Sequence, residues 1–184
     1  MTKLRWLLLL PLSVLLYACP FESNVPLEKA PVEPIDSSLL GYWYGIIKDG
    51  SDYFGIEALE ISRLSDSVYA ITRYGKAVKG DIILPDTAYF TGFSTRVGEQ
   101  AYMSLEAPSP EGKPGKVYYL AAFGMSHDTL QVRTVTETFT TRKYFSRPED
   151  LRKLLLDMHQ QRNIYDDLFT LSYRKIPKPD RFQP

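Results

Sequence analysis

Cysteine, histidine and excess charge are all scarce in this chain of 184 residues. It holds one cysteine, Cys19, and two histidines, so a disulfide within the chain and a thiolate-rich metal site are both excluded. Its 22 basic residues balance 22 acidic ones, and no basic stripe indicates a nucleic-acid partner. The common catalytic, phosphate-binding and calcium-binding motifs are missing too. The sequence therefore predicts no metal, no cofactor and no enzymatic activity.

Long hydrophobic runs are also lacking. Trp6–Leu16 is apolar except for Ser13, and eleven helical residues reach about 16 Å, roughly half the hydrocarbon core of a bilayer. Lys3 and Arg5 precede this run, as positive charge does ahead of an inserting segment. This pattern predicts a signal peptide over residues 1–18.

The leader ends in Leu16-Tyr17-Ala18-Cys19, which resembles the lipobox of bacterial lipoproteins. In that family a diacylglyceryl group is added to the cysteine thiol, and a peptidase cuts before the modified residue. The resemblance implies cleavage between Ala18 and Cys19, lipidation of Cys19, and a membrane as partner through an N-terminal lipid anchor. The expected location is the cell envelope at the outer membrane, on either side. An ordinary secretory signal with an incidental Cys19 is the alternative.

Residues 19–38 are rich in proline and acidic side chains, with Pro20, Pro26, Pro31 and Pro34 at short intervals. Proline fixes φ and removes a backbone donor, so neither a helix nor a sheet interior is expected here. An extended segment of this kind reaches on the order of 50 Å at about 3.1 Å per residue. The composition predicts a disordered tether, with a Pro-rich docking peptide as the alternative.

Residues 39–176 are predicted to form one β domain. Short apolar runs alternate with turn residues about every ten positions, which is typical of a sandwich or barrel. Lys116–Gly124 is apolar on both faces, so a packed layer is expected outside it. The predicted strands are Leu40–Lys48, Phe54–Arg63, Ser67–Tyr74, Ala77–Leu84, Ala88–Arg96, Gln100–Glu106, Lys116–Gly124 and Thr129–Thr136.

A single helix is expected over residues 147–161. Ser146 and Glu149 have the spacing of a capping box, and Leu151, Leu154, Leu155 and Met158 form one apolar stripe. A ninth strand, Leu168–Ile176, is predicted to return to the sheet edge, and residues 177–184 form a tail. The fold class is therefore mostly β: an antiparallel up-and-down barrel of about eight or nine strands with one C-terminal α-helix.

This element order is that of the lipocalins, and Gly41-Tyr42-Trp43 resembles their G-x-W signature. The resemblance implies that Trp43 plugs the closed end of a barrel, that a basic residue, Arg133 or Arg142, stacks on it, and that a pocket holds a small apolar ligand. A plain core aromatic is the alternative role for Trp43. In its architecture the chain also resembles the tethered lipocalin-like lipoproteins of Gram-negative envelopes.

Aromatic side chains are the candidate ligand contacts, because rings can line a barrel interior; an aromatic core with cross-strand pairs is the alternative. We expect a non-enzymatic envelope lipoprotein that binds a small apolar ligand or an envelope protein. The alternatives are a structural subunit with a filled barrel and, third, an unrecognised hydrolase. The candidate contacts are Trp43, Phe90, Tyr102, Tyr119 and Phe123.

Overall fold

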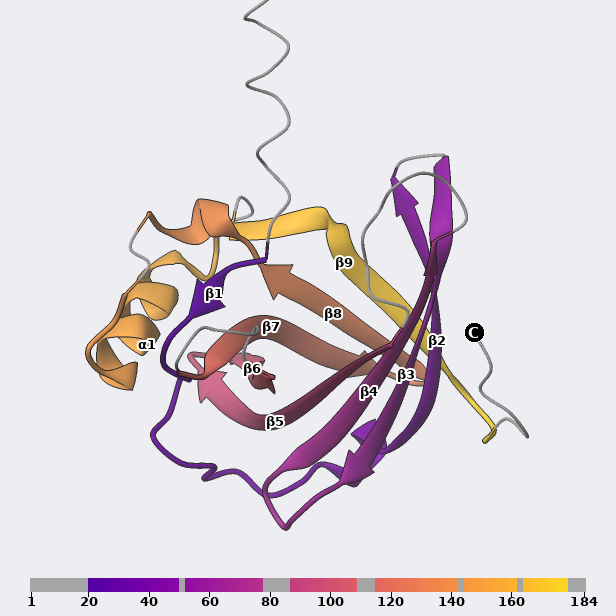
Figure 1. Cartoon of the computed structure of the whole chain (residues 1–184), viewed down its shortest axis with the longest axis horizontal. Helices are drawn as coiled ribbons and strands as arrows, with labels where there is room; N and C mark the ends of the chain where they lie inside the picture. The colour runs from indigo at the N-terminus through magenta and orange to yellow at the C-terminus, as the bar shows by residue number, and fades with distance from the viewer. Residues whose placement is uncertain are drawn as a thin grey trace, which may run out of the picture.

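The computed structural model describes residues 20–49, 52–77, 87–108, 115–141, 144–161 and 164–178. These residues are mostly β, with one α-helix and two short 3-10 helices (Figure 1). The elements are β1 Glu22–Ser23, η2 Ser37–Leu39, β2 Gly41–Asp49, β3 Asp52–Arg63, β4 Tyr69–Ala77, β5 Thr87–Val97, β6 Gln100–Ala107, β7 Val117–Ser126, β8 Thr129–Val135, η3 Glu137–Phe139, α1 Pro148–Met158 and β9 Tyr165–Ile176.

Strands β2 to β9 form a closed antiparallel barrel, so the predicted fold class is confirmed. Each strand from β2 to β8 pairs with the next, and β9 completes the ring. The central residue of this closure is Tyr173, which pairs with Gly45 of β2 on one side and Leu130 of β8 on the other. The predicted strand Leu168–Ile176 is confirmed as part of β9, but its predicted place at a sheet edge is wrong, because β9 has a partner on each side.

Most of the predicted strand Ala77–Leu84 lies outside the part of the chain that the structure describes. β4 continues to Ala77, and β4 pairs directly with β5 from Tyr69↔Gly92 to Tyr74↔Thr87. Residues 78–84 lie outside the described residues. The turn predicted at Gly75 is wrong, because Gly75 pairs with Glu57 of β3 inside β4.

The barrel has two different ends. The closed end contains the turns at residues 64–68, 98–99 and 127–128 and the helix η2. The Ile35 N–H just before η2 donates to the Asp66 carbonyl at 2.9 Å, and Leu39 of η2 is 1% exposed within the inner apolar cluster. At the mouth end, β2 finishes, β8 leads into η3, and β9 begins. The N-terminal segment runs along the outside of the barrel from the mouth end to the closed end (Figure 1).

Apolar side chains form two layers because the strands alternate their faces. The inner cluster contains Trp43, Tyr69, Leu130 and Tyr173. The outer cluster packs α1 against the outside of β5–β7, where Leu120 and Ala122 are fully buried. The expectation of a packed layer outside residues 116–124 is thus confirmed. Figure 1 shows α1 on the side of the barrel away from β2–β4.

Helix α1 begins without the predicted capping box. Its N-cap is Arg147, which makes no side-chain cap hydrogen bond. Arg147 instead pairs with Asp150, with 2.9 Å between Nη2 and Oδ1, and Glu149 pairs with Lys29 at 2.9 Å. The side chains of the first turn are therefore engaged elsewhere, and the helix ends at Met158, three residues earlier than expected.

The N-terminal segment over residues 20–38 is folded onto the barrel, so the prediction of a disordered tether there is wrong. Glu22–Ser23 pairs with Tyr118 and Tyr119 of β7. β8 pairs with β7 only from Ala121 onward, so this part of the β7 edge is left for β1. Phe21 is 3% exposed and packs edge-to-face on Phe139 and Phe145. Leu27 is fully buried and donates its N–H to Ser104 Oγ at 3.1 Å. The prolines lie between these anchor points. Burial of the apolar side chains of this segment stabilises it on the barrel, which outweighs the tendency of a proline-rich segment to stay free and extended.

Candidate ligand site

Trp43 closes one end of the barrel. It is fully buried, and its indole Nε1 donates to the carbonyl of Leu39 in η2 at 2.9 Å. The cation above its ring is Lys175 of β9, with Nζ 5.1 Å from the ring centroid. The expected Arg133 instead lies over Tyr165 at 4.5 Å, and Arg142 lies outside the described residues. β9 pairs with β2 in a register that places Lys175 directly beside Trp43, which explains this correction.

A polar network fills the middle of the lumen. Glu57 of β3 accepts a hydrogen bond from Arg73 Nε at 2.7 Å and another from the Tyr173 hydroxyl at 2.5 Å. Glu57 is 5% exposed, and burial, followed by the Glu57 charge, raises the pKa of Tyr173 well above its ordinary value. The Tyr173 ring packs on Gly45, where a Cβ would lie only 2.8 Å from Tyr173 Cδ1.

One guanidinium nitrogen of this network lacks a hydrogen-bond partner among the described residues. It is the buried Nη2 of Arg73. A buried donor without an acceptor costs free energy, so the network is complete on its Glu57 side and incomplete at Arg73. The ion pair nevertheless leaves the middle of the lumen electrically neutral.

The inner wall near the mouth is apolar and incompletely covered. Phe90 of β5, Leu105 of β6 and Tyr119 of β7 face inward by strand register, and each is only partly buried. Phe90 and Tyr119 meet edge-to-face with ring centroids 6.3 Å apart. These three side chains therefore keep accessible surface at the mouth end of the lumen.

Tyr119 brings a polar group to this wall. Its hydroxyl donates to Glu22 Oε1 of β1 at 3.1 Å. Burial and the nearby Glu22 carboxylate raise the pKa of Tyr119 to about 12. The neutral Tyr119 hydroxyl and the Glu22 carboxylate can therefore form hydrogen bonds at the mouth, next to an apolar surface. This combination is typical of sites for amphipathic molecules.

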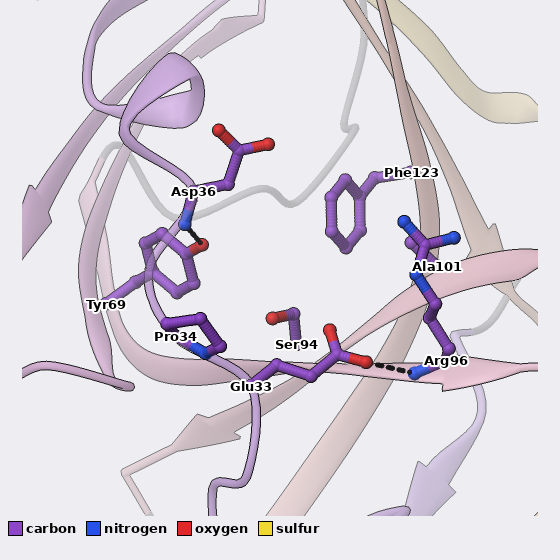
Figure 2. Close-up of a pocket in the computed structure, with 8 residues that line it drawn as sticks. All are labelled: Glu33, Pro34, Asp36, Tyr69, Ser94, Arg96, Ala101 and Phe123. Atoms are coloured by element: carbon purple, nitrogen blue, oxygen red, sulfur yellow. Dashed lines mark hydrogen bonds between the residues drawn. The ribbon is translucent and has the colours of Figure 1, made fainter.

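A pocket of about 390 Å³ lies at the closed end, between the N-terminal segment and the barrel (Figure 2). The Glu33 carboxylate accepts the Arg96 backbone N–H at 2.9 Å, and the Asp36 N–H donates to the Tyr69 hydroxyl at 2.7 Å. Burial raises the pKa of Tyr69. Figure 2 shows Arg96 beside Glu33, and the Phe123 ring across the pocket from Pro34 and Tyr69. The pocket thus offers one aromatic wall, one cation and two hydroxyls, from Tyr69 and Ser94.

β2 and β9 also separate from each other toward the mouth. The two strands pair only from Tyr42↔Ile176 to Gly45↔Tyr173, although β2 runs on to Asp49 and β9 begins at Tyr165. Figure 1 shows these strands diverging above their crossing. A pocket of about 370 Å³ lies where they separate, lined by Tyr44, Gly45, Ile46, Thr170, Leu171, Ser172 and Arg174.

The predicted ligand contacts are divided between these places. Phe90 and Tyr119 lie on the mouth wall, Phe123 lines the closed-end pocket, and Trp43 is the plug. Tyr102 faces outward into the helix-covered cluster, where its hydroxyl meets that of Tyr165 at 2.6 Å. The prediction of Tyr102 as a lumen contact is wrong, because it occupies the opposite phase of β6 from Leu105.

Sequence reasoning missed the pair Glu57 and Arg73. Glu57 precedes Leu59 and Ile61 by even steps, and Arg73 follows Tyr69 and Ile71 in the same way. Even spacing puts residues of a strand on one face. Opposite charges at inward positions of two adjacent predicted strands were the signal that could have revealed this buried pair.

Cys19 lies outside the described residues. Within the described ranges, no helix is long and apolar enough to span a membrane, and no three histidine, cysteine or acidic side chains gather as metal ligands. His159 caps the end of α1 with Nδ1 2.6 Å from the Leu156 carbonyl oxygen, and His127 lies in the β7–β8 turn. No protein family, curated protein or solved structure matches the chain.

Proposed function

We propose that this chain is a lipid-anchored protein of the bacterial envelope, at the outer membrane, whose lipocalin-like barrel binds a small apolar or amphipathic ligand without catalysis. The observation that carries the proposal is the partly exposed inner wall of Phe90, Leu105 and Tyr119. These side chains leave apolar surface that a ligand can cover, and full burial of such a side chain contributes about 1.5–3 kcal/mol.

The lumen suits a ligand with one polar end. Its wall near the mouth is apolar, and its polar groups, the Tyr119 hydroxyl and Glu22, lie at that same end. Deeper in the lumen the Glu57–Arg73 pair is already neutral. An apolar body held against Phe90 with a polar group near Tyr119 therefore satisfies both kinds of surface.

Binding is tested with the fluorescent apolar anion 1-anilinonaphthalene-8-sulfonate on the mature chain carrying Cys19→Ser. Phe90→Ala is expected to weaken binding about tenfold, because it removes roughly 1.5 kcal/mol of apolar contact. Tyr89→Ala is the matched control, since Tyr89 is the adjacent residue on the outer face and is 64% exposed. Equal binding by both variants and the parent chain would contradict a lumen site.

The anchor is tested separately in cells. Metabolic labelling with a radioactive fatty acid is expected to mark the intact chain and to be lost in Cys19→Ser. Labelling that survives this substitution would remove lipidation of Cys19 from the proposal and leave the ligand site unaffected.

A second candidate function is an interaction subunit of the envelope. It is favoured by the outer face of β2–β5, where Tyr44, Ile46 and Tyr89 are 38%, 44% and 64% exposed. Exposed tyrosines and isoleucines on one sheet face are typical of protein interfaces. A photo-reactive residue at position 89 that cross-links a single envelope protein in cells, together with an empty lumen, would favour this function over ligand binding.

A further inference from the structure

The path of the N-terminal segment fixes where any group attached before Pro20 must lie. Pro20 forms a β-bridge with Thr136, and the Phe21 N–H donates to the Val135 carbonyl at 2.9 Å. Val135 is the last residue of β8, at the mouth end. The first described residue is therefore held at the rim of the mouth.

The segment that follows is fastened along its length. Asn24 exchanges two hydrogen bonds with the backbone of Phe145, at 2.8 and 2.9 Å. Glu28 forms an ion pair with Arg152 of α1, and Lys29 pairs with Glu149. With Phe21 and Leu27 buried as well, releasing residues 20–38 as a leash would cost several apolar contacts and hydrogen bonds.

We infer that the mouth end of the barrel sits directly on the bilayer, so that the lumen opens toward lipid. This inference rests on the lipidation of Cys19 in the proposed function. Consecutive Cα atoms are about 3.8 Å apart, so a lipidated Cys19 brings the acyl chains within one residue of the rim. An anchor at one end of the barrel, with no leash between, leaves the closed end facing away from the membrane.

This orientation places the whole mouth half of the barrel next to lipid. The partly exposed wall of Phe90 and Tyr119 and the gap between β2 and β9 belong to that half. A ligand can then pass between bilayer and lumen without crossing water. The ligand class that fits is a membrane amphiphile with an apolar chain, because such a molecule is poorly soluble in water and abundant in the lipid phase.

Orientation is measured on the full lipidated protein, purified in detergent and reconstituted into phosphatidylethanolamine–phosphatidylglycerol vesicles. The lipidated Cys19 has no free thiol, so one introduced cysteine takes all of an environment-sensitive fluorophore. Glu137→Cys marks the mouth end in η3, and Ser65→Cys marks the closed end; both positions are exposed turns. Strong quenching by headgroup-labelled nitroxide lipid is expected at position 137 and little at position 65, since β8 alone separates the ends by up to about 20 Å.

Absence of quenching at both positions would overturn the inference and would indicate a flexible tether between the anchor and the barrel. Quenching at position 65 instead of position 137 would show the opposite orientation. Thr138→Cys and Leu64→Cys serve as a second pair where the first does not fold. Insertion of nineteen Gly and Ser residues between Cys19 and Pro20 is expected to abolish quenching at position 137. Quenching that survives the insertion would contradict the short connection as its cause. If the intact chain takes up no fatty-acid label at Cys19, the lipid anchor of the proposed function is refuted, which is a different result from a wrong orientation.

Discussion

The closed half and the mouth half of this barrel are built from the same strands but packed differently. Toward the closed end, Trp43, Tyr69 and Leu130 are at most 2% exposed, and the Glu57–Arg73–Tyr173 network fills the space above them. Toward the mouth, the inward-facing Phe90, Leu105 and Tyr119 retain solvent contact. β2 and β9 are paired in the first half and apart in the second.

This difference separates two tasks within one sheet. Burial of Trp43 and its neighbours and strand pairing near the plug should contribute strongly to stability, because buried apolar area and satisfied backbone groups are the main favourable terms. The mouth half gives up part of this burial and pairing, and its inward apolar side chains stay accessible. Stability and ligand contact should therefore respond to substitutions in different halves of the same strands.

The largest expected effect comes from truncating the plug. Trp43→Ala should lower the free energy of unfolding by about 3–5 kcal/mol, because it leaves a large cavity among fully buried neighbours. Phe90→Ala at the mouth should cost less than about 1.5 kcal/mol, since its side chain is only partly buried. Urea unfolding of the Cys19→Ser chain measures both. Equal losses would mean that the two halves are packed alike.

Removing one charge of the lumen network comes next. Glu57→Ala should cost about 3–5 kcal/mol, at or below the plug's effect, because Arg73 then stays buried without its carboxylate. The double variant Glu57→Leu with Arg73→Met should recover most of that loss, since no unpaired charge remains. Urea unfolding of the single and double variants checks this. A double variant as unstable as the single one would show that the network's shape, not its charge balance, matters.

The sequence was sufficient for the fold because alternation and turn residues are local signals. The strands, the helix with its stripe at Leu151 and Leu155, and the layer outside residues 116–124 follow from them. The path of residues 20–38 could not be predicted, since Phe21 and Leu27 are buried by partners more than seventy residues away. For the same reason the choice of Lys175 over Arg133 beside Trp43 depends on the register between the first and last barrel strands.

A smaller effect is expected where the two halves meet. Gly45 is the last β2 residue paired with β9, and a Cβ there would lie 2.8 Å from Tyr173 Cδ1 and 3.3 Å from the Ser172 carbonyl oxygen. Gly45→Ala should cost about 1–3 kcal/mol through this crowding. Gly124→Ala in β7 is the matched control, because nothing lies within 4 Å of its Cβ position. If both substitutions prove neutral in urea unfolding, the β2–β9 junction is not tightly packed.

The smallest effect should come from the cation above the plug. Lys175 is exposed, and its Nζ lies 5.1 Å from the centre of the Trp43 ring and donates to the Ser38 carbonyl at 2.9 Å. Lys175→Met keeps the aliphatic stem and should cost about 0.5–1 kcal/mol, whereas Lys175→Arg should be close to neutral. Lys153→Met on the exposed face of α1 controls for loss of a surface charge. A loss above about 2 kcal/mol for Lys175→Met would mean that the cation and its link to η2, more than burial of Trp43, hold the closed end shut.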